Sequence, residues 1–249
     1  MGVLQVEIAR GIATLALDSP PNRNALSTAL MTELLAALAA AGADDAVRVV
    51  VLSHTGPVFC SGADLTEKPA PTALMAEVIA AIWECPKPVV ARVGGPARAG
   101  GLGLVAAADI AVCGEDVTFA FTEVRLGVVP AIISATVLRR LHPRAAAELF
   151  LTGDAFDGRR AAAIGLVSAA APAESVDATV AAYCDGLMRG GPLALAGTKR
   201  VLHRPPAATV REDLAELAAI SAEFFGSEEG REGISARREK RPPRWAPLA

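Results

Sequence analysis

The 249-residue sequence has few aromatic side chains, only 4% of its residues, although 52% of its residues are hydrophobic. Alanine supplies much of this excess, which favours closely packed helices over an aromatic core. No uninterrupted apolar run of about 18 residues is present, so we expect no membrane-spanning helix. No basic segment followed by an apolar one opens the chain, so we expect no secretory signal peptide.

The sequence also lacks an excess of positive charge. It has 24 Lys and Arg against 27 Asp and Glu, a formal net charge of −3, so we expect no general attraction to nucleic acid or acidic membranes. Its cysteines are far apart and lack metal-ligand spacing; they are Cys60, Cys85, Cys113 and Cys184. We interpret them as small buried thiols in a reducing cytoplasm. The three histidines are scattered, so we predict no metal site.

The first half of the chain alternates strands with helices, which predicts an α/β fold. Residues 3–9 and 12–18 are expected to form a hairpin around Arg10 and Gly11. Ser27 is a plausible cap for a helix over 28–41. Further strands are expected at 47–53, 89–93, 109–113 and 117–121, and a further helix at 73–83. These strands are apolar throughout, which is typical of strands buried on both faces.

From about Pro143 the pattern becomes helical. The expected helices cover residues 143–153, 157–166, 175–189, 192–202 and 208–225. The terminal segment 231–245 is strongly basic, which fits either a solvated helix end or contacts with an anionic ligand or a partner subunit.

Five glycines fall within residues 94–103, between an apolar run and an alanine-rich segment. Such clustering costs backbone entropy, so we expect bare backbone close to a ligand. Gly101, Gly103 and Ala106 formally fit a dinucleotide fingerprint, with Glu123 about 20 residues further on. Six residues separate the expected strand 89–93 from Gly100, however, and this spacing argues against a dinucleotide-binding site. No Lys-Ser/Thr pair follows the glycines, so a phosphate-binding P-loop is excluded.

A second loop of small residues, 59–65, also lies between a strand and a helix. Backbone N–H groups from two such loops can hold one oxygen that becomes anionic, as in an oxyanion hole. A pair of tight strand–helix turns is the alternative. Cys60 and Ser61 lie in this loop, but no histidine is near in sequence and no G-x-S-x-G motif is present, so we favour packing over nucleophilic catalysis.

Six segments occur together in one order and spacing. They are NRNAL (22–26), FCSGADL (59–65), GPARAGGLGLVAAADI (95–110), FAFTEVRLGVVP (119–130), LTGDAFDGRRAAAIGLVSAAAP (151–172) and EKRPPRW (239–245). In these segments the sequence resembles the enoyl-CoA hydratase/isomerase, or crotonase, superfamily. The resemblance covers nearly the whole chain. The six segments together identify the superfamily clearly, but they indicate only weakly which reaction the protein catalyses.

The resemblance implies a crotonase-like α/β fold, with repeated ββα units in a spiral core and a C-terminal helical region. Residues 1–190 would form the core with the acyl-CoA site, and 191–249 a region that mediates homo-oligomers, either trimers or hexamers. The substrate would be an acyl-CoA thioester. No separate cofactor is expected, because coenzyme A is part of the substrate.

By motif position, the resemblance assigns the oxyanion hole to the amides of Ala63 and Gly100, and the catalytic carboxylate to Glu123. Glu123 following Thr122 could also simply face solvent at a helix start. The apolar residues beside it would raise its pKa towards the working range. Hydratases of this family commonly carry another glutamate, at the position that Gly103 occupies here.

This departure leaves the reaction open. Glu123 alone could activate water and return its proton to Cα. The segments 100–104 and 121–134 together resemble those of hydratases acting on branched or carboxylated enoyl thioesters. We therefore favour an enoyl-CoA hydratase. A 3,2-enoyl-CoA isomerase needs only one base and is the first alternative. A catalytically silent acyl-CoA-binding paralogue is the second.

The residues expected to border the substrate or its CoA portion are Arg23, Ala25, Ser61, Gly62, Asp64, Leu65, Lys68, Arg98 and Gly103. Arg98 could bind a substrate carboxylate, or point to solvent or pair with an acid. Asp64 is interpreted as a cap that orients its loop rather than as a catalytic group.

Overall fold

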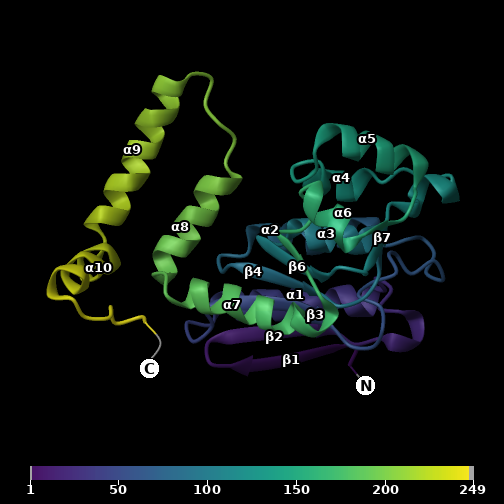
Figure 1. Ribbon diagram of the computed structural model, residues 1–249, viewed down its shortest axis with the longest axis horizontal. Coiled ribbons are helices and arrows are strands. Elements are labelled where there is room, and N and C mark those ends of the chain that lie inside the picture. The colour runs from purple at the N-terminus through teal and green to yellow at the C-terminus, as the bar shows by residue number, and fades with distance from the viewer. Residues whose placement is uncertain (1, 247–249) are drawn as a thin grey trace.

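A six-stranded sheet forms the centre of the fold in the computed structural model, which describes residues 2–246 (Figure 1). The strand order is β1-β2-β3-β4-β6-β9. The strands are β1 (Leu4–Ala9), β2 (Ile12–Leu17), β3 (Val49–His54), β4 (Val89–Val93), β6 (Ile110–Gly114) and β9 (Ala169–Ala171). Within this sheet, in the residues that the structure describes, β1 and β2 are antiparallel and the other neighbours are parallel. The expected α/β alternation is therefore confirmed.

The predicted first hairpin is present. Strands β1 and β2 pair from Leu4–Leu17 to Ala9–Ile12. Arg10 and Gly11 form the turn with φ values of 51° and 78°, in the left-handed region that glycine adopts readily.

The apolar strands are buried because helices cover both faces of the sheet. Val50 and Leu52 of β3 belong to the large core that includes side chains of α1 (Thr28–Ala43) and α2 (Thr72–Glu84). Val49 and Val51 face the opposite way and pack with α7 (Val176–Met188). Side chains alternate across a strand, so a strand covered on both faces must be apolar at every position.

A second, three-stranded sheet stands on the first. It consists of β5 (Ala97–Arg98), β7 (Thr118–Ala120) and β8 (Phe156–Asp157), in that order. Each of its first two strands follows a strand of the main sheet and precedes a helix: β4–β5 leads to α3 (Gly100–Ala107), and β6–β7 leads to the 3₁₀ helix η2 (Thr122–Leu126) and α4 (Ala131–Val137). These are the repeated ββα units that the sequence predicted.

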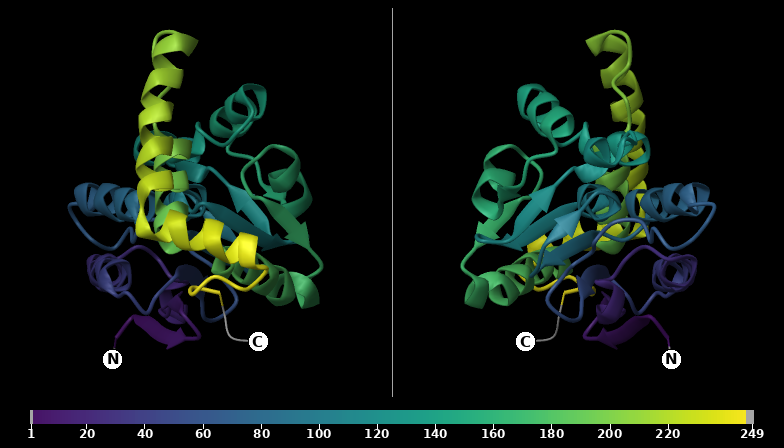
Figure 2. Two further views of the ribbon diagram at one scale, coloured as in Figure 1. Left: turned by 90° about the vertical axis from the view of Figure 1, so that its left-hand side faces the viewer. Right: turned by 90° about the vertical axis from the view of Figure 1, so that its right-hand side faces the viewer.

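The later part of the chain is mainly helical, as expected, but the strands β8 and β9 also lie in it, and the sequence did not predict them. It contains α5 (Pro143–Thr152), α6 (Gly158–Ala163), α8 (Pro192–His203), α9 (Val210–Gly226) and α10 (Glu228–Glu239), and the short 3₁₀ helices are η1 (Pro20–Asn22) and η3 (Ala173–Ser175). Helices α8, α9 and α10 stand beside the α/β core as an arm (Figures 1 and 2). The domain boundary between residues 190 and 191 stays a prediction.

Buried polar contacts join this arm to the core. Lys199 of α8 is buried, and its Nζ lies 2.7 Å from Oδ2 of Asp109, directly before β6. Arg48 donates from Nη1 to the Trp245 carbonyl at 3.1 Å and from Nη2 to the Gly190 carbonyl at 2.5 Å. An uncompensated buried charge is costly, so these partners hold the arm in place.

The four cysteines are free and buried, as the sequence indicated. Burial raises the pKa of the Cys60 thiol to about 12, which makes it a packing group rather than a nucleophile. The expected cytoplasmic location stays a prediction. Within residues 2–246 no helix combines the length and the apolar character needed to cross a membrane.

Candidate active site

Two loops that are far apart in the sequence touch each other beyond the carboxyl ends of β3 and β4. The Arg98 N–H donates to the Cys60 carbonyl at 2.9 Å. Gly62 has a φ of +95°, and a Cβ atom there would lie 3.0 Å from Cβ of Ala99 and 3.6 Å from the amide nitrogen of Gly100. Glycine at position 62 therefore permits both the left-handed backbone and the close approach of the loops.

The amide N–H groups of Ala63 and Gly100 remain available to a ligand. The short bridge between Leu26 and this loop uses the Gly62 carbonyl, at 2.8 Å, and the Asp64 N–H, at 3.4 Å, which leaves the Ala63 N–H out. Gly100 is the first residue of α3, where helical N–H groups lack intrahelical partners. Within residues 2–246, neither N–H makes a backbone hydrogen bond outside the regular elements.

Strand β7 brings Glu123 to the same region. The Ala99 N–H donates to the Ala120 carbonyl at 3.1 Å, so β7 ends beside the start of α3. Glu123 follows three residues later in η2, with a relative exposure of 9%. Its buried Oε2 has no hydrogen-bond partner among the residues described. The alternative that Glu123 merely faces solvent is therefore wrong.

The surroundings of Glu123 favour the protonated carboxyl group. Burial raises the pKa of Glu123 above its usual 4.5, and a hydrogen bond to its own backbone opposes this shift. A carboxyl group with a raised pKa and a vacant oxygen holds a proton more readily than an exposed one and can give it back. The same region thus holds a buried carboxyl group with a vacant oxygen and two N–H groups without backbone partners, and their catalytic roles stay predictions.

Gly103 has no room for a side chain. A Cβ atom at this position would lie 2.7 Å from Cδ1 of Ile79 and 2.8 Å from Cγ2 of Ile133. The two isoleucines, from α2 and α4, therefore occupy the volume that a side chain on this turn of α3 would need. Apolar side chains therefore fill the space beside Gly103.

The sequence matches the enoyl-CoA hydratase/isomerase family over residues 7–247. The chain belongs to this family. The enoyl-CoA hydratase structure from Mycobacterium smegmatis has a TM-score of 0.92 and 30% identity, and the match covers 98% of this chain and 99% of that one. An enoyl-CoA hydratase structure from Mycobacterium avium is 45% identical with a TM-score of 0.76, over 98% and 99% of the two chains.

The family includes more than one kind of activity. The peroxisomal Delta(3,5)-Delta(2,4)-dienoyl-CoA isomerase of Arabidopsis thaliana is 33% identical, over 94% of this chain and 92% of its own. The resemblance inferred from the six segments is thereby confirmed. The crotonase-like fold is confirmed as well, because solved members of the family match the whole architecture. The named activities of these relatives divide between hydration and isomerisation, so membership of the family alone leaves the reaction open.

The first family segment lies against the loop that carries Ala63. Ser61 donates from its N–H to the Arg23 carbonyl at 3.1 Å and from Oγ to the Asn22 carbonyl at 3.3 Å. In the same segment Ala25 is buried, whereas the Arg23 side chain is exposed. The structure thus brings these predicted CoA-binding residues together, and their contact with CoA stays a prediction.

The predicted role of Asp64 in orienting its loop fits its hydrogen bonds. Its Oδ1 accepts from the Thr66 hydroxyl at 2.6 Å and from the Thr66 N–H at 3.0 Å. The hydroxyl contact lowers the pKa of Asp64, with a smaller contribution in the same direction from the N–H. Leu65 and Lys68 continue this loop with exposed side chains.

Arg98 is tied to the small sheet rather than to an acidic side chain. Nη1 donates to the carbonyls of Ala97, at 2.9 Å, and Thr118, at 2.5 Å, while Nη2 donates to the Thr118 hydroxyl at 2.8 Å. Burial lowers the pKa of Arg98. Nε and one N–H of Nη2 remain for another acceptor, so binding of a substrate carboxylate stays a prediction.

Two of the six basic residues in the terminal segment 231–245, Arg241 and Arg244, are paired with acidic residues of the arm. Arg241 places Nη1 2.7 Å and Nη2 3.0 Å from the two carboxylate oxygens of Glu232, and its Nε lies 2.6 Å from Glu239. Arg244 lies 3.7 Å from both Glu232 and Glu228. This pairing favours a structural role for Arg241 and Arg244 over the anion-binding one.

The sequence analysis did not assign a role to Asn24, whose side chain joins residue 19 to the segment 55–58. Its buried amide donates to the carbonyls of Thr55, at 3.1 Å, and Val58, at 2.8 Å, and its Oδ1 accepts from the Ser19 N–H at 2.7 Å. Asparagine within a proline-rich loop was the available signal, because its side chain readily hydrogen-bonds to nearby backbone. Within residues 2–246 no group of three or more His, Cys, Asp or Glu side chains is arranged to hold a metal ion.

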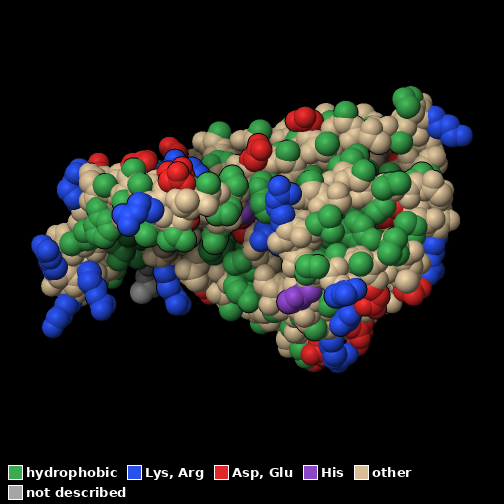
Figure 3. Space-filling view, turned by 90° about the horizontal axis from the view of Figure 1, so that it is seen from above, with side chains coloured by type: hydrophobic (Ala, Val, Ile, Leu, Met, Phe, Trp, Pro, Cys, Tyr) green, Lys and Arg blue, Asp and Glu red, His purple; other side chains and the backbone are tan. Residues whose placement is uncertain are grey.

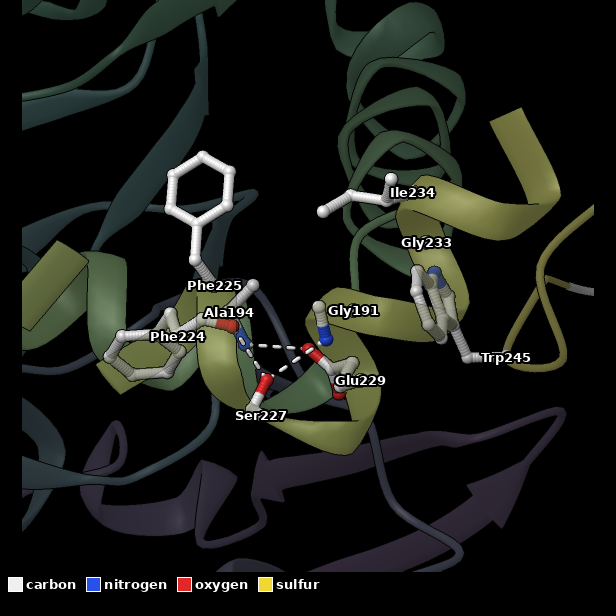
Figure 4. A pocket seen from close by; sticks show the side chains of 10 residues that line it. Gly191, Ala194, Phe224, Phe225, Ser227, Glu229, Gly233, Ile234 and Trp245 are labelled. Atoms are coloured by element: carbon white, nitrogen blue, oxygen red, sulfur yellow. Dashed lines mark hydrogen bonds between the residues drawn. The ribbon is translucent and has the colours of Figure 1, made fainter. Parts of the chain in front are cut away.

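A separate apolar pocket of about 310 Å³ lies within the arm, between α8, α9 and α10 (Figure 4). Phe224, Phe225, Ile234 and Trp245 contribute its larger side chains. Its one acidic residue, Glu229, is occupied, because its two oxygens accept from the N–H groups at the start of α8, at 2.9 and 2.8 Å. The pocket therefore offers apolar surface and no acid/base group.

Proposed function

We propose that this chain is an enoyl-CoA hydratase-type lyase that adds water across the double bond of a 2-enoyl-CoA thioester. Glu123 is the acid/base, and the N–H groups of Ala63 and Gly100 form the oxyanion hole. The observation that carries this proposal is that Glu123 is buried and its Oε2 has no hydrogen-bond partner among the residues described. Glu123 lies three residues beyond the end of β7, where the Ala120 carbonyl accepts from the N–H of Ala99, the residue before α3.

The chemistry needs one carboxylate that acts twice. In its ionised form, Glu123 takes a proton from water while the water oxygen bonds to Cβ. The electrons of the double bond move towards the thioester, and the resulting enolate oxygen accepts hydrogen bonds from the two amides. The protonated Glu123 then gives its proton to Cα, which restores the thioester carbonyl and the carboxylate. Coenzyme A is part of the substrate, and no other cofactor is invoked.

The second candidate is a 3,2-enoyl-CoA isomerase. Ile79 and Ile133 favour it, because they place apolar side chains where another carboxylate would have helped to hold water. Glu123 would then take a proton from Cα of a 3-enoyl thioester and return it to Cγ, through the same enolate. A silent acyl-CoA-binding paralogue is the third candidate and would use the amides without proton transfer.

A panel of three thioesters tests the proposal. We expect the conjugated enoyl-thioester absorbance to fall with crotonoyl-CoA or 3-methylglutaconyl-CoA, and mass spectrometry to detect the 3-hydroxyacyl-CoA product. If this absorbance rises with 3-hexenoyl-CoA and does not change with the other two thioesters, the protein is an isomerase and the hydratase proposal is wrong. No change with any of the three, together with binding of CoA thioesters in calorimetry, would favour the silent paralogue.

The arm is the proposed site of self-association. Large apolar side chains are exposed along α8, α9 and α10, and they are Leu193, Leu202, Val210, Leu214, Phe225 and Ile234. Figure 3 shows hydrophobic side chains gathered over this arm. Soluble monomers rarely expose apolar patches of this extent, so contact with further copies of the chain would remove this surface from water.

We expect the wild-type protein to have the mass of three or six chains in light scattering after size-exclusion chromatography. The double variant Leu214→Glu/Phe225→Glu should have the mass of one chain, because both side chains on α9 are at least 60% exposed here and would become charged within an interface. Val6→Glu on β1, at a side chain of similar exposure, is the control and should not change the mass. A wild-type protein with the mass of one chain would contradict the proposal.

A further inference from the structure

The carboxyl end of α3 is held by one side chain from another element. All eight residues of α3 are buried, so the carbonyls of its last turn need protein partners. Arg140, which follows α4, donates from Nε to the Ala106 carbonyl at 3.1 Å and from Nη2 to the Ala108 carbonyl at 3.0 Å. A cation at this end also interacts favourably with the helix dipole.

The Arg140 guanidinium is committed to this contact. No carboxylate lies within 4.0 Å of it in the part of the chain that the structure describes. Burial lowers the pKa of Arg140, and the charge of Asp109 partly offsets this effect. The guanidinium carbon lies 4.9 Å from the ring centroid of Trp83, whose other ring contact is His203, stacked at 3.8 Å. Trp83 and the two carbonyls thus fix the position of the guanidinium.

The opposite end of α3 is held by backbone contacts: the Ala99 N–H donates to the Ala120 carbonyl at 3.1 Å, and the Arg98 N–H donates to the Cys60 carbonyl at 2.9 Å. Gly100, Gly101 and Gly103 have no side chains that could make hydrogen bonds to neighbouring elements. A helix of this length is a rod of about 12 Å, so a shift or tilt allowed at one end moves the other end as well. The direction of the Gly100 N–H therefore depends on both ends of the rod, and Arg140 is the side chain that anchors the carboxyl end.

We propose that Arg140 is a positioning residue for the oxyanion hole, acting through α3 on the Gly100 amide. This inference rests on the proposed function of the site, because it assigns Arg140 a part in the same chemistry. Arg140 itself does not touch the substrate. Its role is to keep one N–H donor aimed at the oxygen that becomes negative, where small displacements reduce stabilisation of the transition state.

Arg48 provides a matched control. It too is partly buried, its pKa is also lowered by burial, and it also donates to two carbonyls, those of Gly190 and Trp245. Those carbonyls flank the helices of the arm and are not part of α3. Arg48→Met and Arg140→Met therefore both remove a buried guanidinium that binds two carbonyls, and only the second change releases the oxyanion-hole helix.

We expect Arg140→Met to lower kcat by about 10- to 100-fold with less than a threefold change in KM, because the N–H contact strengthens in the transition state. Arg140→Lys should recover part of this loss. Arg48→Met should lower the melting temperature and keep kcat within twofold of wild type. If the folded Arg140→Met and Arg48→Met proteins have the same kcat, Arg140 is only structural and the inference is wrong.

A spectroscopic readout separates this inference from the identity of the reaction. Acetoacetyl-CoA is an acidic thioester whose enolate absorbs in the near ultraviolet, and an oxyanion hole increases the enolate fraction of the bound ligand. We expect a strong band with wild type and Arg48→Met, and a band about five- to tenfold weaker with saturated Arg140→Met. If the wild type turns over no thioester but shows this difference, the proposed function fails and the role of Arg140 stands. Equal bands in all three proteins, or no band in any, would overturn the inference.

Discussion

Replacement of Glu123 by glutamine is expected to lower kcat by about 10²–10⁴-fold, the usual contribution of a general acid/base. Glutamine keeps the shape of the side chain but can neither take a proton from water nor return one to Cα. KM should change little, because the amides of Ala63 and Gly100 still hold the thioester. Steady-state kinetics on the substrate identified from the three thioesters, with isothermal titration calorimetry for CoA affinity, measures both effects.

Glu174→Gln is the matched control, because Glu174 also lies in the first turn of a 3₁₀ helix but is exposed. It should leave kcat unchanged. If Glu123→Gln retains more than about a tenth of wild-type kcat, Glu123 does not transfer the proton.

The same Glu123→Gln variant should be more stable than the wild type above pH 5. Burial raises the pKa of Glu123 in the folded state, so its stabilising contribution is fully present below the unfolded-state value of about 4.5 and is lost as pH rises through the folded-state value. Glutamine stays neutral throughout. We therefore expect a higher melting temperature for the variant than for the wild type at pH 8 and little difference between them at pH 4. The wild-type kcat/KM should rise over the same pH interval as Glu123 ionises.

Replacement of Gly101 by alanine is expected to lower kcat by about 10²–10³-fold, the effect of losing one oxyanion-hole donor. A Cβ atom here would lie 2.8 Å from Cβ of Cys60 and 3.0 Å from the Cys60 carbonyl oxygen. Because the carbonyl belongs to the backbone of the other loop, the methyl group pushes α3 away from that loop. The amides of Ala63 and Gly100 then no longer converge on one oxygen.

Gly186→Ala in α7 is the control for this change. Gly186 is exposed, and a Cβ atom there would meet nothing within 4 Å. Alanine in a helix is more favourable than glycine, so this variant should gain about 0.5–1 kcal/mol of stability and keep the wild-type kcat. Enolate absorbance of bound acetoacetyl-CoA should fall in Gly101→Ala and not in Gly186→Ala. A Gly101→Ala protein with normal kcat and normal absorbance would show that the two loops are not the hole.

The identity of the elements could be predicted from local patterns. The apolar run 47–53 indicated the buried strand β3, Arg10 and Gly11 indicated the first turn, and Ser27 indicated the start of α1, where its hydroxyl accepts from the Leu30 N–H at 3.2 Å. These features depend on residues close together in the chain. The two-residue strands β5 and β8 were not predictable, because they exist only where other strands offer hydrogen-bond partners.

The candidate site could be predicted only in part. The motifs located Ala63, Gly100 and Glu123, but the burial of Glu123 and the vacancy at its Oε2 became visible only in the folded chain. Likewise, Gly103 showed that a carboxylate is missing, whereas the packing of Ile79 and Ile133 showed why none would fit there. Neither isoleucine is near Gly103 in sequence.

The sequence by itself determined the family, the order of strands and helices, and the residue types at the site, because backbone propensity and motif spacing are local properties of a chain. The tertiary structure alone decided which groups face one another. It paired Arg241 with Glu232, attached Arg140 to the end of α3, and brought the Gly62 loop against Gly100. Such contacts depend on burial and on the close approach of segments distant in the chain, which alter the energy of a charge or a hydrogen bond far more than sequence neighbours do.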